Sequence, residues 1–399
     1  MPPYRVYRVG LKRIIFILFI LSVFWIAFVK YIYFSSGNMV IPSSWNISNN
    51  CDLHRLNVNE WDMNFRKLVS ETNPVVYNIS TQACRRNFFP EFASNIRKLL
   101  STKLVKTSPC LDVYSQNTDN HGNHKDHNHV HGQIIKEHES DFPVILTAAS
   151  SDHYQESQAL FKSIHNTLLP LYKDVKIIFY DIGLTAHQHS VMRKYCRCEI
   201  RKFSFSDYAP HVREITGYEW KPLMILEVLK EHEFVLYLDS CIRFTGSWIK
   251  SELNKILRRT KTIGIQLQQS PRWIVSNHTK LDTFVYLEEE ECMFSYPELE
   301  SGLIFLYRNS FTMNSIIKPW VACALTENCM SNPLPQFLKP CTKDIFKLIL
   351  WTRCHRFDQS VLNIILIRIF NRYRKLIEFD GSWIFKILRG DKIDYFPRQ

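Results

Sequence analysis

A short apolar run that ends on a carboxylate most constrains what this chain can fold into. The run covers Phe234–Leu238 and ends directly on Asp239, within the sequence FVLYLDSCIRF. Its length and its branched and aromatic residues predict a strand buried on both faces, as in the middle of a parallel sheet. Ligands of open α/β sheets bind outside the carboxyl ends of the strands. We therefore expect Asp239 to face a metal ion or a ligand hydroxyl, although a lone aspartate at this place also commonly begins a turn.

The chain on either side of this run predicts an alternation of strands and helices. Apolar runs predict further strands at 143–147, 175–180, 198–205, 263–268 and 298–307. Helical spacing of apolar residues predicts helices at about 160–168, 187–195, 220–230, 246–259 and 361–370. Such alternation is typical of a parallel, doubly wound sheet. We predict one α/β domain over residues 141–399.

The order of these elements resembles the GT-A fold of nucleotide-sugar-dependent glycosyltransferases, a Rossmann-like fold with a mainly parallel sheet. In that fold, small residues after the first strand receive the nucleotide. A DxD-type motif after the central strand holds a divalent cation and the donor's diphosphate. The resemblance implies that Asp239-Ser240-Cys241 stands at the DxD position. The donor-binding candidates are Thr147, Ala148, Ala149, Ser150, Asp181, Lys221, Asp239, Ser240, Arg243, Glu300 and Gly302.

The third position of this motif is Cys241 instead of an acidic residue. Mg²⁺ and Mn²⁺ prefer carboxylate oxygen, so Asp239 is the predicted metal ligand. Two alternatives remain open for the charge of the diphosphate. Either Asp239 binds the metal together with the diphosphate and water, or Lys221 and Arg243 replace the metal.

The segment Glu300-Ser301-Gly302 leads into the apolar run that ends at Tyr307. In GT-A enzymes, a comparable segment of small residues often borders the donor or acceptor sugar. Gly302 is alternatively a bulge or a position where two parts of the backbone pack closely.

Two catalytic candidates, Asp358 and His355, lie in the sequence HRFDQ. Many GT-A enzymes carry a similar DQ pair that faces the donor sugar, and the resemblance implies that Asp358 is the general base of an inverting reaction. The alternative is that Asp358 stabilises a helix N-terminus, where the helix dipole favours a carboxylate. For His355 the alternatives are phosphate contact, acid–base chemistry, or satisfaction of a buried polar group.

Two sequences near the C-terminus resemble an uncharacterised family of animal membrane-anchored, glycosyltransferase-like proteins, known as a domain of unknown function. They are KPWVACALTENC at 318–329 and RFDQSVLNI at 356–364. The resemblance covers residues 142–379 and supports the fold more strongly than any particular reaction.

An apolar segment at 14–34 predicts a membrane anchor. A helix over this segment spans about 30 Å, the thickness of a bilayer core. The basic residues Arg5, Arg8, Lys12 and Arg13 precede it, so the positive-inside rule predicts a cytosolic tail at 1–13 and a lumenal C-terminal domain. The alternative is a cleaved signal peptide, whose apolar core is normally shorter.

Glycosylation signals and cysteines agree with a lumenal domain. Sequons begin at Asn46, Asn78 and Asn277. All eleven cysteines follow the anchor, and an oxidising compartment allows many of them to pair. An odd number leaves at least one thiol free, and Cys241 is the candidate because its strand is buried. The last four, Cys323, Cys329, Cys341 and Cys354, indicate a local disulfide cluster.

Residues 35–140 have an irregular pattern, which predicts a stem with some packed structure around short apolar pieces such as Asn95–Leu104. Within it, five histidines crowd into residues 121–131. Such a tract can bind Zn²⁺ or Cu²⁺, but nothing in the sequence fixes ligand geometry. We interpret it as a solvated linker before the α/β domain.

The chain carries a formal net charge of +12, without zinc-finger spacing, an RNP-type motif or a long basic tract. Nucleic acid is therefore not an expected partner. The combined prediction is a single-pass type II Golgi glycosyltransferase that uses a nucleotide-sugar donor and a glycan or glycoprotein acceptor. The alternatives are a non-catalytic relative that binds glycans or serves as a scaffold, and a cell-surface adhesion or receptor module.

Overall fold

The computed structural model describes residues 58–72, 76–77, 84–108, 142–246, 249–331 and 354–397. All of these residues belong to one compact unit. The predicted tail, the anchor at 14–34, the histidine tract, and the sequons at Asn46 and Asn78 lie outside the described residues. Within the described ranges, no helix has the length and apolar character needed to cross a membrane.

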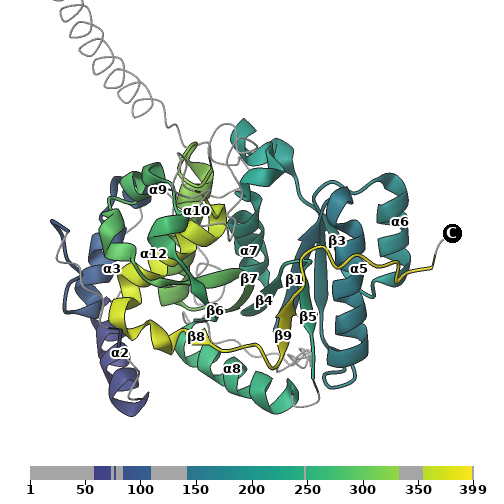
Figure 1. Ribbon diagram of the computed structural model, residues 1–399, viewed down its shortest axis with the longest axis horizontal. Helices are drawn as coiled ribbons and strands as arrows, with labels where there is room; N and C mark the ends of the chain where they lie inside the picture. Colours follow the sequence, from purple (N-terminus) through teal and green to yellow (C-terminus); the bar gives the residue numbers. More distant parts are fainter. Residues whose placement is uncertain are drawn as a thin grey trace, which may run out of the picture. The chain divides into compact units, whose positions relative to one another are not determined.

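A seven-stranded sheet forms the centre of the molecule (Figure 1), in the order β3-β2-β1-β4-β7-β6-β8. Its strands are β1 (Val144–Ala149), β2 (Ile177–Asp181), β3 (Glu199–Lys202), β4 (Phe234–Leu238), β6 (Ile265–Ile274), β7 (Pro297–Tyr307) and β8 (Glu378–Phe379). Two further strands, β5 (Ile242–Phe244) and β9 (Phe385–Ile387), pair with each other in an antiparallel ribbon.

The strand directions confirm a mixed α/β fold with a mostly parallel sheet. β1 is parallel to β2 and β4, β2 is parallel to β3, and β6 is parallel to β8. β7 is antiparallel to both β4 and β6, so the strand predicted at 298–307 is an exception within the mainly parallel sheet. A parallel strand needs a crossover that returns the chain to the other end of the sheet. The chain between β6 and β7 instead forms short helical turns and re-enters the sheet in the opposite direction.

Helices cover both faces of the sheet. They are α5 (Tyr154–Ser163), α6 (Ala186–Tyr195), α7 (Trp220–Glu231), α8 (Ile249–Ile263), α9 (Leu281–Tyr286), α10 (Lys318–Leu325) and α12 (Phe357–Phe370). One core cluster joins alternate residues of β4, Leu236 and Leu238, to the apolar faces of α5, α6 and α8. Alternate strand residues share one face, so these three helices cover that face.

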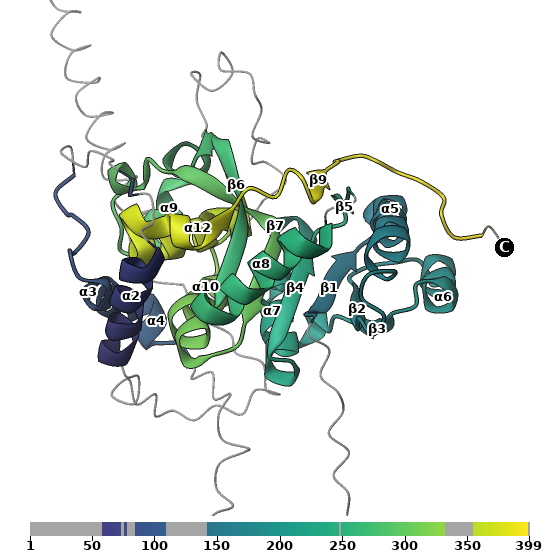
Figure 2. The same ribbon diagram turned by 90° about the horizontal axis from the view of Figure 1, so that it is seen from below.

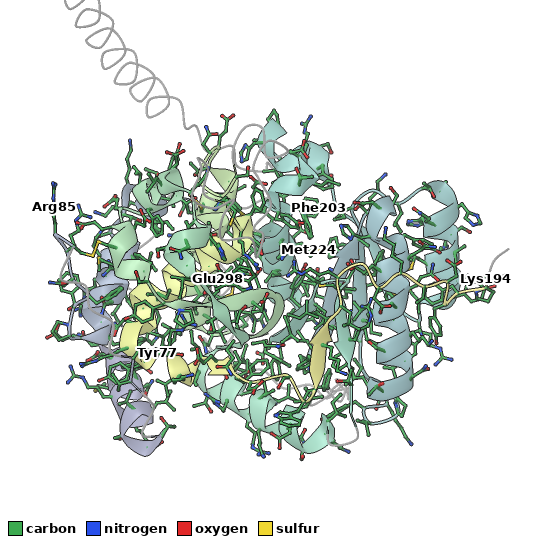
Figure 3. The ribbon with its side chains drawn as sticks, viewed as in Figure 1. Tyr77, Arg85, Lys194, Phe203, Met224 and Glu298 are labelled. Carbon is green, nitrogen blue, oxygen red and sulfur yellow. A yellow bond between two sulfur atoms is a disulfide. The ribbon has the colours of Figure 1, made fainter. Side chains whose placement is uncertain are left out.

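The other helices pack outside that cluster. α7 contacts β4, α12 contacts β7, and α10 contacts both helices. All residues of α12 after Phe357 are buried, which explains its uninterrupted apolar sequence. Met224 of α7, labelled in Figure 3, is fully buried in this layer.

Short helical turns join these elements. They are η2 (Ser151–His153), η3 (Ile164–Leu168), η4 (Phe205–Asp207), η5 (Pro210–Arg213), η6 (Ile215–Gly217), η7 (Val275–His278), η8 (Glu291–Phe294), η9 (Thr312–Ile317) and η11 (Asn371–Leu376). Asn277, the acceptor of the third sequon, is exposed in η7.

The packed structure predicted within residues 35–140 consists of α2 (Val58–Thr72), α3 (Phe92–Leu100) and α4 (Lys103–Lys106). Figure 2 shows α2 and α3 beside α12, and α3 contacts α12 directly. The ring of Phe92 stacks on Phe65 at 3.9 Å and lies 5.7 Å from the ring of Phe370. These helices therefore belong to the same core as the α/β domain rather than to a separate stem.

Three disulfide bonds lie within the described residues: Cys84–Cys292, Cys196–Cys198 and Cys323–Cys329. Cys354 is also disulfide-bonded. Among the described cysteines Cys241 is free and buried, which confirms the prediction of a free thiol there. The Cys323–Cys329 bond confirms local pairing within the last four cysteines, and Cys84–Cys292 ties the N-terminal helices to the domain.

Candidate functional site

A cavity of about 240 Å³ lies at the carboxyl ends of the neighbouring parallel strands β1 and β4. Ala148 and Ala149 of β1 and the following Ser150 line one side of it, and Asp239 and Ser240, which follow β4, line the other. The structure therefore brings together the two sets of residues that the sequence predicted at separate strand ends. A larger cavity of about 440 Å³ lies between α2 and residues 309–311, and none of the predicted site residues lines it.

Asp239 is held in place but remains partly open to the cavity. Its Oδ1 accepts a hydrogen bond from the Tyr237 hydroxyl at 2.7 Å, and its amide donates to the carbonyl of Gly302 at 2.8 Å. Its side chain is 31% exposed. A Cβ atom at position 302 would lie 2.6 Å from Asp239 Oδ2. Gly302 is therefore required so that β7 can approach this carboxylate, and it acts from behind the site rather than on a ligand.

Lys221 bridges two carboxylates directly behind the cavity. Its Nζ lies 3.2 Å from Asp239 Oδ1 and 2.7 Å from Asp358 Oδ2. The rings of Tyr218 and Tyr237 also face the ammonium, at 5.5 and 5.1 Å. Burial alone would lower the pKa of Lys221, but the two carboxylates outweigh it and raise this pKa. Lys221 is therefore a permanent cation.

Asp358 does not reach the cavity. It is buried in the first turn of α12, where its carboxylate binds Lys221 and its carbonyl accepts a hydrogen bond from Trp320 Nε1 at 3.2 Å. Lys221 thus stands between Asp358 and any ligand near Asp239. The geometry does not support the predicted role of Asp358 as a general base, and the helix N-terminal alternative fits better.

His355 is likewise outside the site. Its Nε2 donates to the carbonyl of Met330 at 2.7 Å, and its Nδ1 accepts from the amide of Lys280 at 3.3 Å. Burial, aided by the charge of Lys280, lowers the pKa of His355 to about 3. Of the predicted alternatives, the neutral and fully paired imidazole matches a satisfied buried polar group.

Two more predicted donor residues have structural partners instead of facing the cavity. Asp181 accepts hydrogen bonds from the amides of Gly183 and Leu184 and pairs with His189, which fixes the turn after β2. Arg243 pairs with the Asp391 carboxylate at 2.9 Å and donates hydrogen bonds to the backbone carbonyls of Ser240 and Asp391. Arg243 is therefore not available to replace a metal.

Thr147 and Glu300 complete the predicted set. Thr147 is fully buried within β1, one residue before the cavity. Glu300 is buried beside the cavity, where its Oε2 lies 3.9 Å from a guanidinium nitrogen of Arg389. Neither residue lines the cavity itself.

Several residues that line the cavity were missed by the sequence analysis: Asp152, His153, Glu156, Tyr218, Trp220, Arg389 and Gly390. Tyr218 has a φ of +62°, a left-handed conformation that costs energy for a residue with a side chain. Glu156 is the most connected of the group. Burial would raise its pKa, but hydrogen bonds from His153, Ser240 and the Gly390 amide lower it to about 2.

The donor set does not fit a divalent metal held by protein side chains. Asp239 Oδ1 is already bonded to Tyr237 and lies beside Lys221, which leaves one carboxylate oxygen. Burial, followed by the nearby charge of Asp239, raises the pKa of Cys241 to about 12, so this thiol stays protonated. Across the described ranges, the one cluster of three potential ligands is Cys84, Glu290 and Cys292, whose two cysteines form a disulfide.

A family model described as a protein of unknown function (DUF1647) matches residues 116–226, which include β1, β2 and β3. No curated protein matches the chain.

Several solved structures resemble it. Core-mannan synthase A from Aspergillus fumigatus, in an Mn/GDP form, has 10% identity and a TM-score of 0.37 over 61% of this chain and 73% of that one. The mannosyltransferase Ktr4p from S. cerevisiae has 9% identity and a TM-score of 0.37 over 83% and 91%. Mouse xyloside xylosyltransferase 1 has 11% identity and a TM-score of 0.34 over 60% and 84%. Because these scores are below 0.5, we infer no substrate, metal or reaction from them.

Proposed function

We propose that this protein is a glycosyltransferase that moves a sugar from a nucleotide-sugar donor to a glycan or glycoprotein acceptor. One observation carries the proposal. The cavity at the ends of β1 and β4 joins a turn of small residues, Ala148–Ser150, to Asp239, and Lys221 is fixed directly behind this carboxylate. An α/β sheet with a cavity at this edge is suited to a nucleotide, and Asp239 is suited to accept hydrogen bonds from sugar or ribose hydroxyls.

The proposed reaction breaks the bond between the anomeric carbon and the diphosphate oxygen. The electron pair of that bond leaves with the nucleoside diphosphate, and the acceptor oxygen forms the new bond to the anomeric carbon. In this scheme the acceptor's proton goes to the departing diphosphate. Asp358 does not take it, because Lys221 lies between Asp358 and the cavity. No step of this scheme passes through a metal ion, because no group of three His, Cys, Asp or Glu ligand atoms converges at the cavity among the described residues.

The chain's own residues bind and orient in this scheme. The absence of large side chains at Ala148 and Ala149 leaves room for the nucleotide beside β1. Lys221 fixes the orientation of Asp239, so that the carboxylate is preorganised before the donor arrives. Tyr237 and Gly302 serve the same purpose, through the hydrogen bond from the Tyr237 hydroxyl and the close approach of β7 at Gly302.

We further propose a single-pass type II arrangement in the Golgi membrane, with the anchor at 14–34 and the α/β domain in the lumen. The apolar segment, the basic residues before it and the three sequons support this arrangement. The disulfides and the exposed position of Asn277 are compatible with it. Digestion by a glycan-specific endoglycosidase, compared between wild type and Asn277→Gln, tests whether the domain is lumenal.

The test of the proposed activity uses the full chain purified in detergent. It is incubated with a panel of UDP-sugars and GDP-sugars and a mixture of glycan acceptors, and nucleoside diphosphate release is measured. We expect release with one donor, dependent on an acceptor and lost in Asp239→Asn. Asp174→Asn, an exposed aspartate outside the cavity, is the matched control. No donor binding and no release by folded protein would contradict the proposal.

Two observations favour a second candidate, a non-catalytic protein that binds the same donor. Lys221 covers Asp358, and Cys241 occupies the third position of the DxD-like motif. The panel separates the two functions, because the non-catalytic protein would bind a donor without releasing nucleoside diphosphate from it under any acceptor condition.

A further inference from the structure

Glu156 connects three separate parts of the chain around the cavity. Its Oε2 accepts hydrogen bonds from His153 Nδ1 at 2.9 Å and from the Ser240 hydroxyl at 2.8 Å. Its Oε1 accepts from the amide of Gly390 at 2.7 Å. The side chain is buried in the first turn of α5. The spacing of one helical turn explains the bond to His153, but it does not explain the bonds to the end of β4 and to the C-terminal segment.

The C-terminal segment, drawn in yellow beside α5 in Figure 1, forms a tight turn at the cavity. The Leu388 amide donates to the Cys241 carbonyl at 2.8 Å, and Asp391 pairs with Arg243 at 2.9 Å. Between these two attachments, Gly390 has a φ of +76°, which favours glycine. The residue between Leu388 and Gly390 is Arg389, so its backbone is fixed on both sides.

The side chain of Arg389 extends from this fixed backbone and makes one weak ion-pair contact. It lines the cavity and is 66% exposed, and its ion-pair partner, Glu300, is 3.9 Å away, at the limit of such a contact. Its guanidinium donors are therefore free to bind an anion in the cavity.

His153 is the second basic side chain that lines the cavity. The hydrogen bond to Glu156 raises its pKa against the opposing effect of burial, and Asp152 and Asp239 act in the same direction. Its Nδ1 is bound to Glu156, while its Nε2 lies 3.6 Å from Asp152 Oδ2. The imidazole is half-exposed, so a ligand can reach it.

We propose that Glu156 positions His153 and Arg389 as a pair of cationic donors that contact the diphosphate of the nucleotide-sugar. This inference rests on the proposed function and assigns the residues that bind the charged part of the donor. Lys221 cannot serve alone, because its single charge is shared by Asp239 and Asp358. The planar guanidinium of arginine matches two phosphate oxygens at once. The first turn of α5, where Glu156 lies, adds the positive end of a helix dipole.

The carboxylates near the cavity, which would repel an anion, mostly have hydrogen-bond or ion-pair partners. Glu156 accepts three hydrogen bonds, and Asp239 is bonded to Lys221 and Tyr237. Asp152 accepts from the Ser150 hydroxyl and is the most exposed carboxylate at the cavity. A diphosphate between His153 and Arg389 would therefore meet cations on two sides.

Calorimetric titration of the full chain with UDP and with GDP tests the inference. Arg389→Gln should weaken binding of the preferred diphosphate by roughly 10- to 100-fold, because one charge-assisted contact is lost. The exposed Lys386 of β9 supplies the control, since Lys386→Gln removes the same charge three residues away and outside the cavity. Its effect should stay within about twofold at ordinary ionic strength.

The role of His153 gives a signature that a merely structural residue would not show. In wild type, diphosphate binding should weaken as the pH rises from about 6 to about 9, because the imidazole loses its charge. His153→Asn keeps a residue that caps helices well and should flatten this pH dependence. Glu156→Gln should shift the weakening to lower pH, because the hydrogen bond that the charged imidazole donates to the carboxylate is weakened.

The outcomes separate this inference from the proposed function. Binding that is weakened by Arg389→Gln and not by Lys386→Gln supports both. Equal binding by wild type and Arg389→Gln, together with an unchanged pH dependence in His153→Asn, overturns the inference and leaves the function standing. No binding of either diphosphate by folded wild-type protein overturns both. Melting temperatures of the variants confirm folding, and the exposed Arg389 side chain ensures that at least one informative variant folds.

Discussion

Lys221 and Arg368 are both buried cations, yet their surroundings differ in one respect that separates a site from a core. Arg368 of α12 donates to Glu289 at 2.6 Å and to Asn95 at 3.4 Å, and its partner carboxylate is fully buried. Lys221 is equally buried, but Asp239, one of its two partners, is 31% exposed at the cavity. A fully buried ion pair such as Arg368–Glu289 therefore has a structural role. The pair of Lys221 and Asp239 can also bind a ligand, because its carboxylate is partly exposed at the cavity.

The largest effect on stability is expected for the fully buried ion pair between Arg368 and Glu289. Arg368→Met leaves Glu289 buried without its cation, and we expect a loss of about 3–5 kcal/mol in the free energy of unfolding. Urea unfolding followed by circular dichroism measures it. Lys255→Met, which breaks the surface pair with Glu252, should change stability by no more than about 0.5 kcal/mol. Equal effects of the two substitutions would show that Arg368 does not hold α3 and α12 together.

The open carboxylate should behave in the opposite way. Asp239→Asn leaves Lys221 bonded to Asp358, so stability should change by less than about 1 kcal/mol. Sugar transfer should fall by about 10²- to 10³-fold, as expected for the loss of one preorganised group in an active site. Initial rates with the preferred donor, compared with the control Asp174→Asn, measure this loss. A large loss of stability with unchanged transfer would show that Asp239 has a structural role, like the partner of Arg368, and does not bind a ligand.

Glu156 lies between these two extremes, because it is buried like Glu289 but serves the cavity. Its lowered pKa means that the ionised carboxylate stabilises the fold above its ordinary pKa near 4.5, and that this contribution is lost as the pH falls towards about 2. Glu156→Gln should therefore lower the free energy of unfolding by about 1–3 kcal/mol at pH 7. This loss should become smaller as the pH falls from about 4.5 to about 2. Urea unfolding of both proteins across this range measures the difference. A difference that does not change with pH would exclude this role of the charge.

The smallest effect is expected from removal of divalent metal. Since Cys241 stays protonated and Asp239 is already paired with Lys221, EDTA should change the affinity for UDP or GDP by less than about twofold. Titrations in EDTA and in excess Mn²⁺ measure this. Binding that requires Mn²⁺ would contradict this prediction. It would show that the diphosphate brings a metal ion to Asp239.

The sequence predicted the parts of the site that lie at the ends of apolar strands. β4 ending at Asp239, and β1 ending at Ala148 and Ala149, are local patterns, and neighbouring parallel strands end at the same edge of a sheet. Lys221 was also found, because it lies in the helix that leads directly into β4.

The remainder could not be read from local patterns. Gly390 binds Glu156 across 234 residues of sequence, and no periodicity marks the turn that carries Arg389. An apolar run does not encode strand direction, so the antiparallel course of β7 was missed. Asp358 occupies a position that suits either a helix N-terminus or a catalytic base, and only its packing against Lys221 decides between them.

Photoaffinity labelling tests most directly whether the cavity between β1 and β4 is the nucleotide site. The full chain is irradiated with azido derivatives of UDP and GDP, with and without excess unmodified nucleotide, and labelled peptides are identified by mass spectrometry. We predict competed labelling in peptides that contain residues 148–156 or 215–220, which line this cavity. Competed labelling confined to peptides from α2 or residues 309–311, at the larger cavity, would contradict this assignment.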